Sequence, residues 1–302
     1  DTTRLNLRVG LGNLSYRYGN DYLELQGSTW SAFGRLGGQL GSDLRLQSEA
    51  RVYYAGAYAG NLHLRGSLQW DPASDWHFFA RYRLQRLYPS LRDQWYVSNN
   101  FNWRRDFDPT TDNLLSYGLS YKQDHQLEVR HYNGTNFLYY DAQSTPRQAS
   151  AGVNYTRITA TQNLRFWEFL HLDNKATWQL QYGGEAFLPL PEWVLRHSLY
   201  FEIRLFDRAL QVLAGTELQY FTRFDSPSYN PALGRFFLAG ERPFGDYPYL
   251  DFFAQFKVGK AHLYVRYQHV NEGLTSYDYY AAPHYPRSDR RLRLGLRWRF
   301  FN

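Results

Sequence analysis

Four arginines alternate with large apolar residues close to the C-terminus. Arg291, Arg293, Arg297 and Arg299 share one parity, and Gly295 completes their series. In an extended strand, residues two apart lie on one face. A guanidinium stays charged and donates up to five hydrogen bonds, so such a face can bind anions or neighbouring carboxylates. Facing lipid, each arginine would cost about 2–4 kcal/mol. We therefore expect this face to contact water or paired acids.

Polar residues alternate with apolar ones in the same way further up the chain. The other arginines with this spacing are Arg45, Arg51, Arg65, Arg81, Arg83, Arg204 and Arg266, and the acids are Glu49, Glu202, Glu217 and Asp251. We interpret the set as a positive wall tempered by carboxylates. Two roles remain open: recognition of anionic or polyhydroxylated solutes, or arginine–carboxylate and arginine–tyrosine pairs that lock the structure.

Catalytic and metal-binding chemistry find little support. The nine histidines are scattered, and no two stand at ligand spacing beside a third donor, so we predict neither a metal site nor any other cofactor. His269 and His284, with Ser276 and Asp278 nearby, are the best candidates for a hydrolase site. Their spacing alone defines no triad. We therefore expect a protein that is not an enzyme.

The composition points to a membrane boundary without helical spans. Of 302 residues, 19% are aromatic, whereas lysine occurs at four positions only. Mean hydropathy is −0.61, and the longest apolar runs fall far short of the roughly 20 residues that a spanning helix needs. The lack of cysteine excludes a disulfide scaffold and a zinc ribbon. The net charge of +6 is spread singly along strands, without a recognition helix, so nucleic acid is not an expected partner.

Alternation with period two predicts antiparallel hairpins over most of the chain. Tight turns are expected at 71–75, 173–174, 206–208 and 259–260, and long loops at 223–247 and 271–288. If the last strand descends to the periplasm, both long loops are extracellular, which is the asymmetry typical of outer-membrane barrels. The phase of the alternation breaks at several places within 13–42 and 122–170.

A soluble β-sandwich or propeller also alternates, but its polar face would be rich in lysine and glutamate. Here that face carries Arg, Gln, Asn, Ser and Tyr, and aromatics recur near segment ends as in interfacial girdles. We predict an all-β fold: a transmembrane antiparallel up-and-down β-barrel of about 16 strands, within a range of 14 to 18. Residues 1–302 form one domain.

Several motifs in the last hundred residues are shared with a known family. They are residues 220–222 (YFT), 228–233 (SYNPAL), 245–251 (GDYPYLD), and 285–286 (YP) followed by 294–300 (LGLRWRF). Together they resemble the putative porin family of Bacteroidetes, over roughly residues 60 to 302. The resemblance implies an outer-membrane β-barrel with no catalytic motif to transfer. Family members are often longer at the N-terminus, and the start at Asp1 suggests a processed or trimmed product.

These observations lead to two functional hypotheses. The first is an outer-membrane channel for passive diffusion of small hydrophilic solutes, including anionic ones. The alternative is a structural or accessory barrel, plugged by its loops, within a larger outer-membrane or secretion complex. The expected partners are the lipid bilayer, lipopolysaccharide, small solutes and other outer-membrane proteins. Occlusion of the bore by extracellular loops would favour the alternative.

Overall fold

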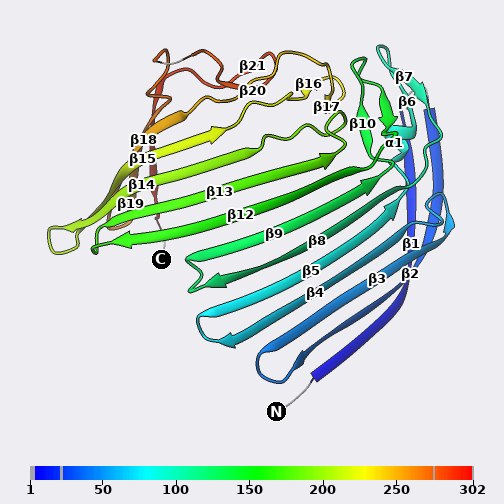
Figure 1. The fold of residues 1–302 in the computed structure, drawn as a ribbon, viewed down its shortest axis with the longest axis horizontal. Coiled ribbons are helices and arrows are strands. Elements are labelled where there is room, and N and C mark those ends of the chain that lie inside the picture. Colours follow the sequence, from blue (N-terminus) through cyan, green and yellow to red (C-terminus); the bar gives the residue numbers. More distant parts are fainter. Residues whose placement is uncertain (1–3, 21–22, 275, 301–302) are drawn as a thin grey trace.

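A single curved sheet of 14 antiparallel strands dominates the computed structural model (Figure 1). The structure describes residues 4–20, 23–274 and 276–300. The strands of the sheet, in spatial order, are β1 (Arg4–Asn20), β2 (Leu23–Leu40), β3 (Leu44–Gly56), β4 (Leu62–Ala73), β5 (Trp76–Leu87), β8 (Thr110–Tyr121), β9 (His125–Thr135), β12 (Val153–Phe166), β13 (Leu170–Gly183), β14 (Trp193–Leu205), β15 (Leu210–Phe221), β18 (Tyr249–Val258), β19 (Ala261–Gln268) and β22 (Arg291–Trp298).

Small elements lie in the loops between these strands. They are α1 (Leu91–Gln94) and the paired short strands β6 (Trp95–Val97) and β7 (Asn102–Arg104), β10 (Leu138–Tyr140) and β11 (Pro146–Gln148), β16 (Ser228–Asn230) and β17 (Arg235–Phe237), and β20 (Tyr280–Ala282) and β21 (Tyr285–Pro286). Among the described residues, no helix is long and apolar enough to cross a membrane.

The topology confirms the predicted up-and-down arrangement, because every strand of the sheet pairs with the next sheet strand along the chain. The count of 14 lies at the lower end of the expected range. The hairpin turn at 206–208 is confirmed, with positive φ angles of 52°, 49° and 69°. Gly259, at φ 54°, lies in the confirmed turn at 259–260. The reversal predicted within 71–75 is confirmed at residues 74–75, between β4 and β5.

The predicted turn at Asp173–Asn174 is wrong. Both residues lie inside β13, where Asn174 pairs with Gln162 of β12 and His197 of β14. The chain reverses instead between Phe166 and Leu170, and Trp167 has a φ of 46°. Asp and Asn favour turns because their side chains bond to the nearby backbone. Here the ladder on both sides of β13 outweighs that local preference.

The register divides the sheet into two chemically distinct faces. We call them the polar face, which carries Arg65 and Glu49, and the apolar face, which carries Leu294 and Leu296. The two leucines are 66% and 63% exposed. A soluble fold would bury such side chains. The apolar residues of the sheet therefore point outward, as the alternation predicted.

Aromatic rings cover glycines on the polar face. Phe33 covers Gly10 and Tyr264 covers Gly295, and each ring and glycine are direct cross-strand partners. This arrangement fills the gap left by a missing side chain and protects the neighbouring ladder. The ring takes the space that a side chain at the glycine would occupy.

The long loops all leave the same end of the sheet, and three of them pack together into a cap (Figure 1). We define the cap as residues 88–109, 137–149 and 224–244. Its small core consists of Trp103, Tyr140 and Leu233, one from each loop. These are among the few buried apolar side chains of the described structure. A conventional core thus exists in the loops, while the sheet is one layer thick.

Substitution of Gly215 by alanine should destabilise the sheet by about 1–3 kcal/mol, the range for inserting a methyl group into a packed site. The new Cβ would overlap the Leu199 carbonyl and Tyr200, neither of which can move without disturbing the ladder. Gly37→Ala, also on the polar face, is the control, because its Cβ would meet its nearest neighbour at 3.6 Å. Urea unfolding in lipid vesicles would measure the free energy of unfolding of both variants. Equal stabilities would refute the claim that the close contacts at Gly215 exclude a side chain.

Candidate functional site

Arginines from neighbouring strands stand in direct register on the polar face. Arg8 pairs with Arg35, Arg35 with Glu49, Glu49 with Arg65, and Arg65 with Arg83, across β1 to β5. Directly opposed residues have Cβ atoms about 4.5–5.5 Å apart, at which like charges repel. This row of four arginines and one glutamate is therefore unfavourable unless water, the central carboxylate or a bound anion compensates it.

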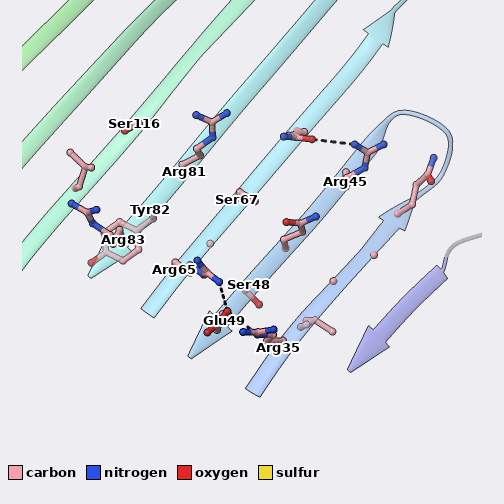
Figure 2. Close-up of a pocket in the computed structure, with 18 of the residues that line it drawn as sticks. Arg35, Arg45, Ser48, Glu49, Arg65, Ser67, Arg81, Tyr82, Arg83 and Ser116 are labelled. Carbon is pink, nitrogen blue, oxygen red and sulfur yellow. Dashed lines mark hydrogen bonds and ion pairs between the residues drawn. The ribbon is translucent and has the colours of Figure 1, made fainter. Parts of the chain in front are cut away.

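Glu49 is the counter-charge at the centre of this row (Figure 2). Its Oε2 atom accepts from Arg35 Nε at 2.9 Å and from Arg65 Nη2 at 2.5 Å. The Glu49 side chain is only 14% exposed, whereas that of Arg65 is 64% exposed. One carboxylate thus orients two guanidinium groups whose remaining donors still face the open side of the sheet.

Two further arginines of the polar face, Arg81 and Arg83, have no acidic partner within the part of the chain that the structure describes. Arg81 lies over the ring of Phe79, 4.4 Å from its centroid. The ring face attracts a cation without neutralising it. Arg81 therefore keeps its full charge and its outward donors.

These residues line a hollow of about 950 Å³ along β2 to β9 (Figure 2). Six arginines and two glutamates contribute to it, interspersed with Ser, Gln and Asn. The charged residues are Arg35, Arg45, Arg65, Arg81, Arg83, Arg130, Glu49 and Glu128. We call this set the arginine patch. Its excess of positive charge and its neutral donors suit carboxylate, sulfate or phosphate groups.

A second cluster on the polar face is dominated by carboxylates. Glu217 of β15 pairs directly with Asp251 of β18, and their side chains are 8% and 3% exposed. Arg266 lies between them, with Nη2 at 3.0 Å from Glu217 and 2.7 Å from Asp251. Arg196 binds the other oxygen of Glu217 at 2.9 Å. The cluster is an internally neutralised network, so it serves to hold β14, β15, β18 and β19 together.

The register places the predicted wall residues of the strands on the polar face, but it brings them together in separate groups. Arg45, Arg51, Arg65, Arg81 and Arg83 lie on β3, β4 and β5. Glu217, Asp251 and Arg266 form the carboxylate cluster, while Glu202 pairs with Arg204 at 3.5 Å near the short turns. Arg291, Arg293 and Arg297 lie on β22, and Arg299 follows its end. Arg291 donates to Gln268 at 3.0 Å.

Sequence patterning missed two arginines of the arginine patch, Arg35 and Arg130, together with Glu128. Arg35 lies on a strand whose apolar face is built from Ala32 and Gly34, while Phe33 lies on the polar face. The hydrophobic alternation is therefore inverted locally. Around Arg130, His131 occupies the apolar face and breaks the pattern. Assigning faces from the alternation of the neighbouring strands would have located both arginines.

The cap folds inward over the polar face at the long-loop end. Tyr18, which shares the polar face of β1 with Arg8, donates to the Trp95 carbonyl at 2.9 Å. Because Trp95 belongs to the loop after β5, that loop reaches across the end of β2, β3 and β4. The mouth of the polar side is thus narrowed by the chain itself.

Asp93 ties the cap loops together. It accepts from the hydroxyl of Tyr140 at 2.6 Å and lies 3.6 Å from Arg235, residues of the two other cap loops. Burial and the bond to Asp93 raise the pKa of Tyr140, so its hydroxyl remains a donor. Arg92 adds a bond of 2.6 Å to the Leu233 carbonyl. The three loops therefore behave as one body.

The candidate hydrolase residues do not assemble. His269 bonds to the Tyr247 hydroxyl and to the Ser288 carbonyl, while His284 pairs with Glu241. Asp278 binds Arg223 and Arg242 instead of either histidine. Among the described residues, no group of three His, Asp or Glu side chains could hold a metal ion. This geometry supplies no nucleophile with an adjacent base.

The fold is that of outer-membrane barrel receptors. The ferric enterobactin receptor PfeA of Pseudomonas aeruginosa superposes with a TM-score of 0.63 at 12% identity, covering 89% of this chain and 46% of the receptor. The pyoverdine receptor FpvA of P. aeruginosa gives a TM-score of 0.59 at 15% identity, covering 94% of this chain and 44% of that one. This chain thus spans less than half the length of either receptor. The likeness shows the architecture alone.

The family follows from the sequence. The chain belongs to the family described as "Putative porin", whose profile matches residues 2–302. No curated protein sequence matches it. The predicted family and outer-membrane location are thereby confirmed, and the apolar face of the sheet contacts the lipid bilayer. The bacterial group of origin stays a prediction.

Replacing Arg266 by leucine should lower the free energy of unfolding by about 3 kcal/mol, the scale for removing one partner of a buried ionic cluster. Glu217 and Asp251 would then face each other without their shared cation. Arg204→Leu, at an exposed pair, should cost less than about 1 kcal/mol. Urea unfolding in vesicles provides the measurement. Restoration of stability when Glu217→Gln and Asp251→Asn are added would confirm the cause.

Proposed function

We propose that this protein is an outer-membrane channel for passive diffusion of small hydrophilic solutes and that it favours anions. The observation that carries the proposal is the register row Arg8–Arg35–Glu49–Arg65–Arg83 on the polar face. A row meant only to lock strands together would alternate charges, as the carboxylate cluster does. Four arginines against one glutamate leave a standing positive field instead.

The exposure of these groups supports a role toward solutes. Arg35 and Arg65 keep about half or more of their side-chain surface open while bound to Glu49. Charge rings along an aqueous path raise the local concentration of counter-ions and set selectivity. The hollow at the arginine patch is large enough for a small organic anion. No catalytic role is part of the proposal.

The cap favours a second candidate, a barrel plugged by its loops that serves a larger complex. Three loops share a packed core and fold over the polar side, as the Tyr18–Trp95 bond demonstrates. A rigid cap can narrow a channel or close it. The channel candidate requires that ions pass the cap, whereas the plugged barrel requires that they do not. Ionic current therefore distinguishes the two candidates.

Current through the purified protein in a planar bilayer tests the primary proposal. We expect stepwise conductance with a reversal potential that indicates anion preference across a potassium chloride gradient. Absence of current from correctly folded protein, judged by resistance to protease, would overturn the channel proposal and support the plugged barrel.

Replacing Arg65 and Arg83 together by serine should reduce the anion-over-cation permeability ratio by about half or more, because it removes two charges from one row. The control is the double lysine variant, which keeps the charge and should retain the preference. The reversal potential in a salt gradient measures both variants. If the serine variant behaves like the parent, the arginine patch does not line the ion path.

Replacing Asp93 by alanine should loosen the cap and raise single-channel conductance. The substitution removes the acceptor for Tyr140 and the counter-charge of Arg235. Loss of such a buried charged hydrogen bond costs about 1.5–3 kcal/mol, enough to populate an opened cap. Asp141→Ala is the control, because Asp141 binds Arg147 within its own loop. Equal conductance in both variants would mean that the cap does not restrict the path.

A further inference from the structure

The apolar face carries a row of polar side chains in direct register. His125 of β9 pairs with Gln162 of β12, Gln162 with Asn174 of β13, and Asn174 with His197 of β14. Parity assigns them to the lipid side, since their alternate neighbours on each strand, such as Leu127, are apolar. We call these four residues the polar row.

The polar row begins beside a short turn and runs into the apolar band. His125 directly follows the turn after β8, whereas Gln162 has Leu164 and Phe166 between it and the end of β12. Along β13, Asn174 has Leu170 and Leu172 toward the short turns and Ala176 and Trp178 toward the cap. The rings of Trp178 and its partner Trp193 are 6.3 Å apart and mark the upper aromatic boundary. Asn174 and Trp178 are four residues apart, a separation of about 13 Å along the strand. Hydrocarbon is the expected environment at that depth.

The hydrogen bonds of the row are incomplete. His197 Nδ1 and Asn174 Oδ1 are 2.7 Å apart, which uses one atom of each. Among the described residues, neither the Gln162 carboxamide nor the His125 ring has a hydrogen-bond partner. Lipid tails offer none to Gln162, and an unsatisfied polar group in hydrocarbon is strongly unfavourable. An outside surface that supplies donors and acceptors would remove this cost.

A second polar row on this face, Asn113, Asn133 and Asn154, lies toward the cap, and Asn133 donates to Asn154. The sector of β18 and β22 holds no such row. On β18 and β22 the corresponding positions hold only leucine, phenylalanine, alanine, valine and tryptophan. Next to the polar row, an apolar hollow of about 380 Å³ opens between β4 and β9, lined among others by Trp70, Phe78 and Leu127. One sector of the apolar face thus has polar groups and a hollow, and the sector of β18 and β22 has neither. This contrast defines a docking surface.

We propose that the outer wall around the polar row binds a second copy of this chain. Amides and neutral imidazoles both donate and accept, so the row is complementary to itself when turned by a two-fold axis. A lipid phosphate would require cations, and β9, β12, β13 and β14 present no arginine or lysine on this face. The hollow would receive apolar side chains of the partner copy.

Cysteine cross-linking in intact membranes tests this, since the chain contains no native cysteine. Ala176 on β13 is next to the row, whereas Ala254 on β18 faces lipid in the apolar sector. Ala176→Cys should yield a product of twice the mass, about tenfold more than Ala254→Cys. Adding Asn174→Leu and His197→Leu should reduce that yield about tenfold, the effect of 1.4 kcal/mol.

Three results would overturn the proposal. Equal yields at the two cysteines would indicate random encounters. Absence of cross-linking in Ala176→Cys would indicate that the wall around the polar row contacts lipid and not a second copy. A product joined to a polypeptide of another mass would identify a different occupant. The double leucine variant should keep its conductance, because neither residue faces the polar side. The outcome is therefore independent of the proposed transport.

Discussion

The requirement that every backbone amide find a partner within the sheet shapes this protein. In a bilayer no water replaces a missing hydrogen bond, so strands must pair along their length. The ladder then fixes side chains alternately to the two faces. Arginine is therefore kept out of the central, lipid-facing stretch of the apolar face, and the strict parity of β22 shows that separation in its simplest form. Charged residues that do have the parity of the apolar face, such as Arg17, Glu24 and Arg86, lie at strand ends beside the loops.

The two charged clusters of the polar face differ in how they are neutralised. Around Glu217 and Asp251, buried acids and arginines match, and the network joins four strands. Around Glu49, one acid serves an arginine row that remains open to water. The first arrangement is structural. The second leaves donors available and can act on a solute, so the same residue type has different roles on one wall.

The cap contains a hydrophobic core of the kind found in soluble domains. Trp103, Tyr140 and Leu233 form a small core from three loops, fastened by Asp93. The sheet instead places rings over glycines, as Tyr264 does on Gly295. The thin wall thus carries the charged surface, and the compact cap covers part of it at the long-loop end.

The sequence by itself determined the all-β class, the parity of most strands, the turns at 206–208 and 259–260 and the family motifs, because period two is a local property of the chain. It could not determine which arginines become neighbours, since register is set by pairing between distant strands. Arg35 and Arg130 were hidden by Phe33 and His131, which lie on faces opposite to their chemistry. Asn174 suggested a turn until the ladder placed it in the membrane wall beside His197. The separation of wall charges into an open patch and a closed network, and the union of three loops into a cap, depend on contacts between residues far apart in sequence, and only the tertiary structure decides these.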